Sequence, residues 1–157
     1  MLCGGGVKGR AQLVNSATRE PVHSSTMVAN DDWLLNLSII DVELTGAKIY
    51  FTAKTCLDNP DGMSGDFKLS SDSTTEISVT PNGGNPNRLD AIIRVPYTAT
   101  AVVFPPDKMT VTYYFDVQIV RAGTPTNAPK RQTYFRGENC YFNVTRDITL
   151  NLTGTLP

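Results

Sequence analysis

After an irregular N-terminal stretch, apolar and polar residues alternate in short segments, and this period of two constrains the fold more than any other feature. In the first such segment Trp33, Leu35 and Leu37 fall on one side of an extended chain. Asn36 and Ser38 fall on the other side. Successive side chains of a β-strand point to opposite faces of its sheet. The segment is therefore predicted to form a strand with one buried face.

The same alternation recurs along the chain, separated by residues that favour turns. The expected strands after the first are 47–54, 67–69, 76–80, 89–95, 110–121, 131–135, 140–144 and 148–152. Gly, Pro, Asn and Asp occupy the breaks, and each favours turn conformations. Only 98–103 predicts a helical turn. Short alternating strands at regular spacing are typical of an all-β, antiparallel β-sandwich.

The apolar residues that share one parity within each strand form the predicted core. They are Trp33, Leu35, Leu37, Ile49, Phe51, Ile93, Phe115, Val117, Phe142 and Val144. At 157 residues the chain is long enough to close one such core without covalent cross-links.

Residues 1–30 show no sustained period, and Gly4, Gly5, Gly6 and Gly9 remove local preference for regular structure. We therefore divide the chain into an extended N-terminal arm, 1–30, and a β-sandwich domain, 31–157. The arm is expected to hold at most one short strand near 12–15, to be mobile in isolation, and to become ordered by strand addition to a neighbouring subunit. Its candidate contact residues are Leu2, Val7, Leu13, Val14, Met27 and Val28.

Charge and composition exclude several classes of partner. The net charge is −1, and no basic run is present, so binding to nucleic acid is not expected. No apolar run approaches the ~20 residues of a membrane span, and no signal segment is visible. The three cysteines are odd in number and widely spaced, which predicts three free thiols in a protein made in a reducing cytoplasm.

The sequence offers little for catalysis. His23 is the one histidine and lies in the glycine-rich stretch, where no rigid partner for a nucleophile is expected. Cysteine, histidine and carboxylate residues do not cluster at the spacing of metal ligands. We therefore predict a protein that is not an enzyme and has no catalytic residues, no cofactor and no metal.

Aromatic residues gather in the last third of the chain as neighbouring pairs. They are Tyr113, Tyr114, Phe115, Tyr134, Phe135, Tyr141 and Phe142. Neighbours in a strand point to opposite faces, so one member of each pair is expected in the core and the other outside. Tyr114, Tyr134 and Tyr141 are therefore candidate interface residues. An outward aromatic row suits a protein interface or a sugar-stacking platform.

Several segments, in order, resemble a known family. They are 30–37 (NDDWLLNL), 42–54 (VELTGAKIYFTAK), 114–119 (YFDVQI), 136–137 (RG) and 142–149 (FNVTRDIT). Together they are similar to the immunoglobulin-like N-terminal domain of the tailed-phage upper baseplate protein family and of related small phage virion proteins. The similarity covers about residues 30–150. It implies an immunoglobulin-like sandwich, in which Asp116, between the core-facing Phe115 and Val117, should point to the outer face or satisfy a neighbouring loop.

The resemblance implies a bacteriophage structural protein of the virion, made in the host cytoplasm. The first reading is a tail or baseplate connector, homo-oligomeric and held by other virion proteins. The freestanding sandwich with an arm also suits a capsid decoration (cement) protein bound to the major capsid protein. A carbohydrate-binding sandwich that aids host attachment is the third reading.

Overall fold

The computed structural model contains ten strands and one short 3-10 helix in the residues that it describes. The described residues are 10–29, 31–41, 44–56, 66–80, 84–100, 108–123, 125–126, 128–135 and 140–146. The strands are β1 (Arg10–Asn15), β2 (Thr26–Val28), β3 (Trp33–Ile40), β4 (Lys48–Lys54), β5 (Phe67–Ser70), β6 (Ile77–Thr80), β7 (Arg88–Val95), β8 (Thr110–Arg121), β9 (Lys130–Tyr134) and β10 (Tyr141–Thr145). The 3-10 helix, Tyr97–Thr100, follows β7.

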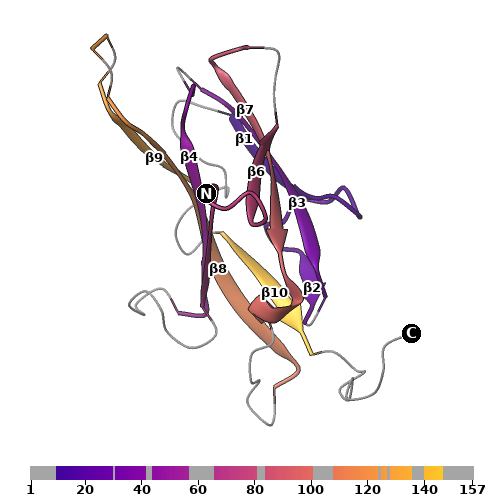
Figure 1. The fold of residues 1–157 in the computed structure, drawn as a ribbon. Helices are drawn as coiled ribbons and strands as arrows, with labels where there is room; N and C mark the ends of the chain where they lie inside the picture. Colours follow the sequence, from indigo (N-terminus) through magenta and orange to yellow (C-terminus); the bar gives the residue numbers. More distant parts are fainter. Residues whose placement is uncertain are drawn as a thin grey trace.

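The strands form two sheets that face each other as a β-sandwich (Figure 1). The first sheet has the order β1-β3-β7-β6, and the second has the order β2-β10-β8-β4-β5. Strand β9 also pairs with β8, so the long β8 has β4 along one edge and β10 and β9, one after the other, along the opposite edge. With β1, β3, β7 and β6 as strands A, B, E and D, and β10, β8, β4 and β5 as G, F, C and C′, this is an immunoglobulin-like order.

One strand pair departs from the antiparallel pattern. Strand β2 runs parallel to β10, with Met27 opposite Val144, whereas every other strand pair in the described residues is antiparallel. The second sheet is therefore mixed.

The alternation in the sequence matches the burial in the structure. Along β8 the buried residues Phe115, Val117 and Ile119 alternate with the half-buried Asp116 and Gln118. All ten residues of the predicted core are buried. The expected strands agree with β3 to β10 to within a residue or two at their ends, and the expected strand 148–152 lies outside the described residues.

Aromatic rings fill the space between the sheets towards one end of the sandwich. Phe142 stacks on Tyr113 with ring centroids 5.4 Å apart and meets Trp33 of the first sheet edge-on at 5.8 Å. Phe115 contacts both Phe51 and Phe142, at 5.9 and 5.7 Å. Such pairs contribute about 0.5–1.5 kcal/mol each beyond the area they bury. The cluster ties β4, β8 and β10 to β3.

The predicted arm is wrong for residues 10–29, because they are part of the sandwich. Strand β1 pairs with β3 along its whole length, and β2 adds to the second sheet beside β10. Four apolar residues of this segment are buried in the core: Leu13, Val22, Met27 and Ala29. The domain boundary therefore does not fall at residue 30, and residues 1–9 lie outside the described residues.

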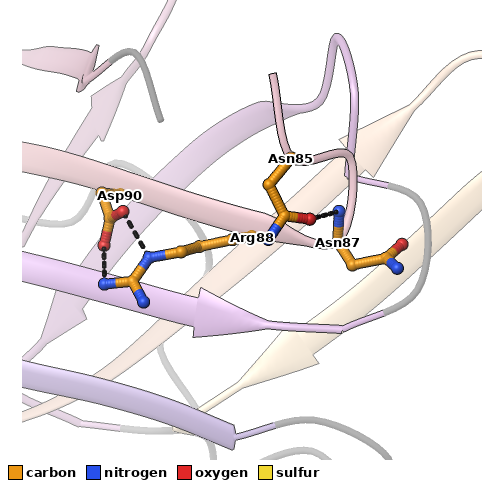
Figure 2. Close-up of polar contacts among 4 residues, drawn as sticks. All are labelled: Asn85, Asn87, Arg88 and Asp90. Atoms are coloured by element: carbon orange, nitrogen blue, oxygen red, sulfur yellow. Dashed lines mark hydrogen bonds and ion pairs between the residues drawn. The ribbon is translucent and has the colours of Figure 1, made fainter. Parts of the chain in front are cut away.

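The turn into β7 packs its backbone against the chain that leaves β3. Gly84 has a φ of 84°, and the Asn85 side chain accepts a hydrogen bond from the Asn87 backbone N–H at 2.9 Å (Figure 2). The Asp41 N–H donates to the Asn87 carbonyl at 3.0 Å. Just beyond, Arg88 binds Asp90 through Nε at 2.8 Å, so these two charges neutralise each other on the outer face of the first sheet.

Candidate functional site

The outer face of the second sheet presents tyrosines from three neighbouring strands. Tyr141 of β10 lies directly opposite Tyr114 of β8, and Tyr114 lies opposite Lys54 of β4. Tyr50, further along β4, lies opposite Gln118 of β8. All three tyrosines are half-buried, as expected for rings that lie on a sheet surface.

Cationic side chains surround these tyrosines. Lys48 and Lys54 belong to β4, Lys68 to β5 and Arg131 to β9, and their strand positions put them on the outer face. The Lys68 ammonium lies 5.2 Å from the centre of the Tyr50 ring, which is a cation–π contact. We call the set Tyr50, Tyr114, Tyr141, Lys48, Lys54, Lys68 and Arg131 the tyrosine–lysine face.

Two carboxylates reduce the positive charge of this face. Asp116 lies opposite Thr52 and, being half-buried between core-facing neighbours, faces outward as the resemblance implied. At the margin, Asp72 binds Lys48 at 2.8 Å. This hydrogen-bonded pair raises the pKa of Lys48 and lowers the pKa of Asp72. Both side chains are more than half exposed, so the pair contributes little to stability.

Two of the three tyrosines predicted to face outward do so, and the third prediction is wrong. Tyr114 and Tyr141 lie on the tyrosine–lysine face, whereas Tyr134 is fully buried. Its neighbour Phe135 is also buried. Phe135 has a φ of 50°, so the chain turns at the end of β9 and the strict alternation of sides is lost. Tyr50 was not singled out from the sequence, although its place in the alternating segment 47–54 indicated an outward side chain.

Tyr134 belongs to a polar cluster inside the sandwich. Its hydroxyl donates a hydrogen bond to the Asp41 carboxylate, which also binds the Lys130 ammonium at 3.3 Å. Burial, with added effect from the hydrogen bond to Asp41, raises the pKa of Tyr134 well above the usual value for a tyrosine. The cluster joins the end of β3 to β9 and so links the two sheets.

The candidate contact residues near the N-terminus are placed differently from one another. Leu13 and Met27 are buried in the chain's own core, so they cannot contact a neighbouring subunit as predicted. Val14 is half-buried on β1, and Val28 is 40% exposed at the end of β2. Leu2 and Val7 lie outside the described residues.

His23 is held by packing rather than by a catalytic partner. Its ring meets the Tyr141 ring edge-on at 5.2 Å. Its Nδ1 is buried and has no hydrogen-bond partner in the described residues. A histidine that acts as a general base needs a hydrogen-bonded nucleophile and an orienting group, and the neighbour seen here is an aromatic ring.

The prediction of three free thiols is wrong. Cys140, buried just before β10, is disulfide-bonded. Cys56, at the end of β4, is free and exposed. Cys3 lies outside the described residues. An odd count of widely spaced cysteines gives no sign of which of them meet in space, so the bond could not be predicted from spacing.

Across the described ranges, no group of three or more His, Cys, Asp or Glu side chains is arranged as metal ligands would be. The part of the chain that the structure describes has no helix long and apolar enough to span a membrane. No model of a protein family matches the chain, and a search of curated proteins finds no match either.

Proposed function

We propose that the chain is a non-enzymatic structural protein of a tailed-bacteriophage virion, a tail or baseplate connector that docks onto neighbouring virion subunits. The proposal starts from the segments that resemble the upper baseplate family. Their described parts fold as β3, β4, β8 and β10. The last three are neighbours in the second sheet, so the resemblance extends over one continuous surface.

The observation that carries the proposal is the tyrosine–lysine face. Tyrosine is enriched where proteins contact each other, because its ring supplies apolar area and its hydroxyl a hydrogen bond. Tyr50, Tyr114 and Tyr141 lie together on a sheet surface rather than scattered over the molecule. A flat sheet face with such rings favours docking onto another folded protein.

The partners in this proposal are other virion proteins, and copies of the chain form a homo-oligomer within the particle. Neither nucleic acid nor membrane is a partner. The protein is made in the cytoplasm of the host bacterium and works in the virion.

Quantitative mass spectrometry of purified particles of the encoding phage tests this proposal. A tail or baseplate connector should be present in a few to roughly a few dozen copies, as the symmetry of such assemblies requires. Hundreds of copies would instead favour the capsid decoration reading. Absence of the chain from washed particles would overturn both.

The same tyrosines also support a second candidate, a carbohydrate-binding sandwich that aids host attachment. Aromatic rings on an accessible face can stack on sugar rings. A glycan array with the purified protein tests it. Saturable binding to a defined glycan that is lost in Tyr114→Ala would favour this candidate over the structural one.

A further inference from the structure

The two outer faces of the sandwich differ in how their charges are satisfied. On the first sheet Arg88 binds Asp90, and Arg94 donates to the Ser78 hydroxyl at 2.9 Å. No tyrosine belongs to the four strands of that sheet. On the first sheet's outer face one ion pair, Arg88 with Asp90, is therefore formed, and Arg94 is held by neutral acceptors.

The tyrosine–lysine face carries an excess of positive charge. It bears Lys48, Lys54, Lys68 and Arg131, against Asp116 as the carboxylate that faces outward from its described strands. Asp72 neutralises Lys48 at the margin. Lys68 and Arg131 are exposed at two opposite edges of the face. The excess is notable in a chain whose net charge is −1.

The geometry of the face sets the size of what it can bind. The rows Tyr141–Tyr114–Lys54 and Arg131–Val120–Lys48 mark its two ends along the strands. Lys54 follows Lys48 by six residue steps along β4, so the face is roughly 20 Å long, which an extended segment of about six to eight residues would span. Ammonium and guanidinium groups bind carboxylates, and the tyrosine hydroxyls can donate to them as well.

We propose that the tyrosine–lysine face is the docking surface for an acidic segment of another protein, with aromatic or apolar residues placed between its carboxylates. This inference rests on the proposed structural function and names the surface and the partner chemistry. A second copy of the chain does not fit through the same face, because like charges would be brought together. The partner's carboxylates bind Lys68 and Arg131, and its apolar side chains lie on the tyrosine rings.

The test uses the full chain and a synthetic peptide of about eight residues, the length that spans the face, in which aspartate and tyrosine alternate at every second position with serine between them, so that both point to one side. In a ¹⁵N-resolved NMR titration, the backbone amides whose chemical shifts change on adding the peptide should cluster at outer positions of β4, β5, β8, β9 and β10. The double variant Lys68→Glu/Arg131→Glu should weaken binding about tenfold or more, and added salt should weaken it too. Lys108→Glu, an exposed lysine outside the face, is the matched control and should change the dissociation constant less than about twofold.

Each other outcome counts against the inference. Chemical-shift changes on the first sheet would show that the peptide binds elsewhere. An equal dissociation constant for the double variant and the original chain would show the same. Tighter binding of a short DNA duplex than of the peptide would replace the acidic protein with nucleic acid. Self-association in analytical ultracentrifugation that the double variant abolishes would replace it with a second copy.

The test is independent of the test of the proposed function. If the chain is present in particles but does not bind the peptide through this face, the proposed virion role stands and the docking surface is overturned. A chain that binds the peptide through this face but is absent from particles would retain the surface and overturn the virion role.

Discussion

Tyr113 and Tyr134 are both fully buried, yet they stabilise the sandwich in different ways. Tyr113 lies among rings: it stacks on Phe142 at 5.4 Å and contacts Phe67 at 5.6 Å. Tyr134 is tied by its hydroxyl to Asp41, a buried carboxylate shared with Lys130. The ring of the first tyrosine packs among other rings, whereas the hydroxyl of the second makes a polar contact between the sheets.

The difference shows which parts of the interior tolerate change. In the aromatic region each ring has several neighbours, and the cost of a substitution follows the volume removed. In the polar cluster Tyr134 and Lys130 both bind the Asp41 carboxylate, so removing one group takes a hydrogen bond or an ion pair from another. Substitutions in the two regions should therefore fail for different reasons.

The largest effect is expected in the aromatic region. Phe115→Ala should lower the free energy of unfolding by about 3–5 kcal/mol, because Phe115 contacts Phe51, Phe135 and Phe142. Urea unfolding followed by tryptophan fluorescence measures it. The control Thr110→Ala, exposed on the same strand, should stay within about 0.5 kcal/mol. A loss below about 1 kcal/mol for Phe115→Ala would contradict the packing described for β8.

Asp41→Ala should have the next largest effect. It leaves the Tyr134 hydroxyl without its acceptor and Lys130 without its counterion, at a cost of about 2–3 kcal/mol. Asp90→Ala is the matched control, since its ion pair with Arg88 lies on the surface and should cost at most about 1 kcal/mol. Equal losses for the two variants would show that burial of Asp41 adds nothing.

Tyr134→Phe and Tyr113→Phe separate the two regions directly. Tyr134→Phe removes the donor to Asp41 and should cost about 1–2 kcal/mol. Tyr113→Phe keeps the ring contacts with Phe142 and Phe67, so its cost measures the contribution of the Tyr113 hydroxyl alone. In a double-mutant cycle, Tyr134→Phe and Asp41→Ala should be coupled by about 1 kcal/mol or more, because they touch. Additive losses would mean that the contact between Tyr134 and Asp41 carries no net stability.

The last prediction concerns alkaline pH. Burial, with a smaller contribution from the Asp66 carboxylate, raises the pKa of Tyr113 to about 12, from 10.0. Above pH 10 the unfolded chain loses this proton while the folded chain keeps it, so stability falls as pH rises from about 10 to about 12. The slope is about 1.4 kcal/mol per pH unit for each such tyrosine. Tyr113→Phe should flatten the slope measured by urea unfolding, and an unchanged slope would contradict a buried, protonated Tyr113.

Much of the fold could be predicted because the strands with one buried face repeat their pattern over many residues. Strand β8 alternates for most of its twelve residues, and its register follows from parity alone. Residues 10–29 were misjudged because each piece is short: β2 has three residues with Met27 as its buried one. Such a short strand gains its stability from the sheet that it joins. The local sequence pattern therefore gives no sign of it.

The candidate site also has residues whose direction could be predicted from the sequence and one whose direction could not. Tyr114 and Tyr141 lie within regular strands, so their outward direction follows from the alternation. Tyr134 lies opposite the core-facing Val117 of β8, so the pairing of β9 puts it inside, and the turn at Phe135 brings that ring inside as well. Its partner Asp41 is 93 residues away in sequence, so their contact is a property of the assembled sandwich.

A cryo-EM map of the assembled phage particle tests the docking role most directly. The account predicts density for the sandwich in the tail or baseplate, with the tyrosine–lysine face covered by an acidic surface of another virion protein. The outer face of the first sheet, with its paired Arg88 and Asp90, should be the more accessible of the two. A particle without this chain, or one in which Tyr50, Tyr114 and Tyr141 all face solvent, would contradict it.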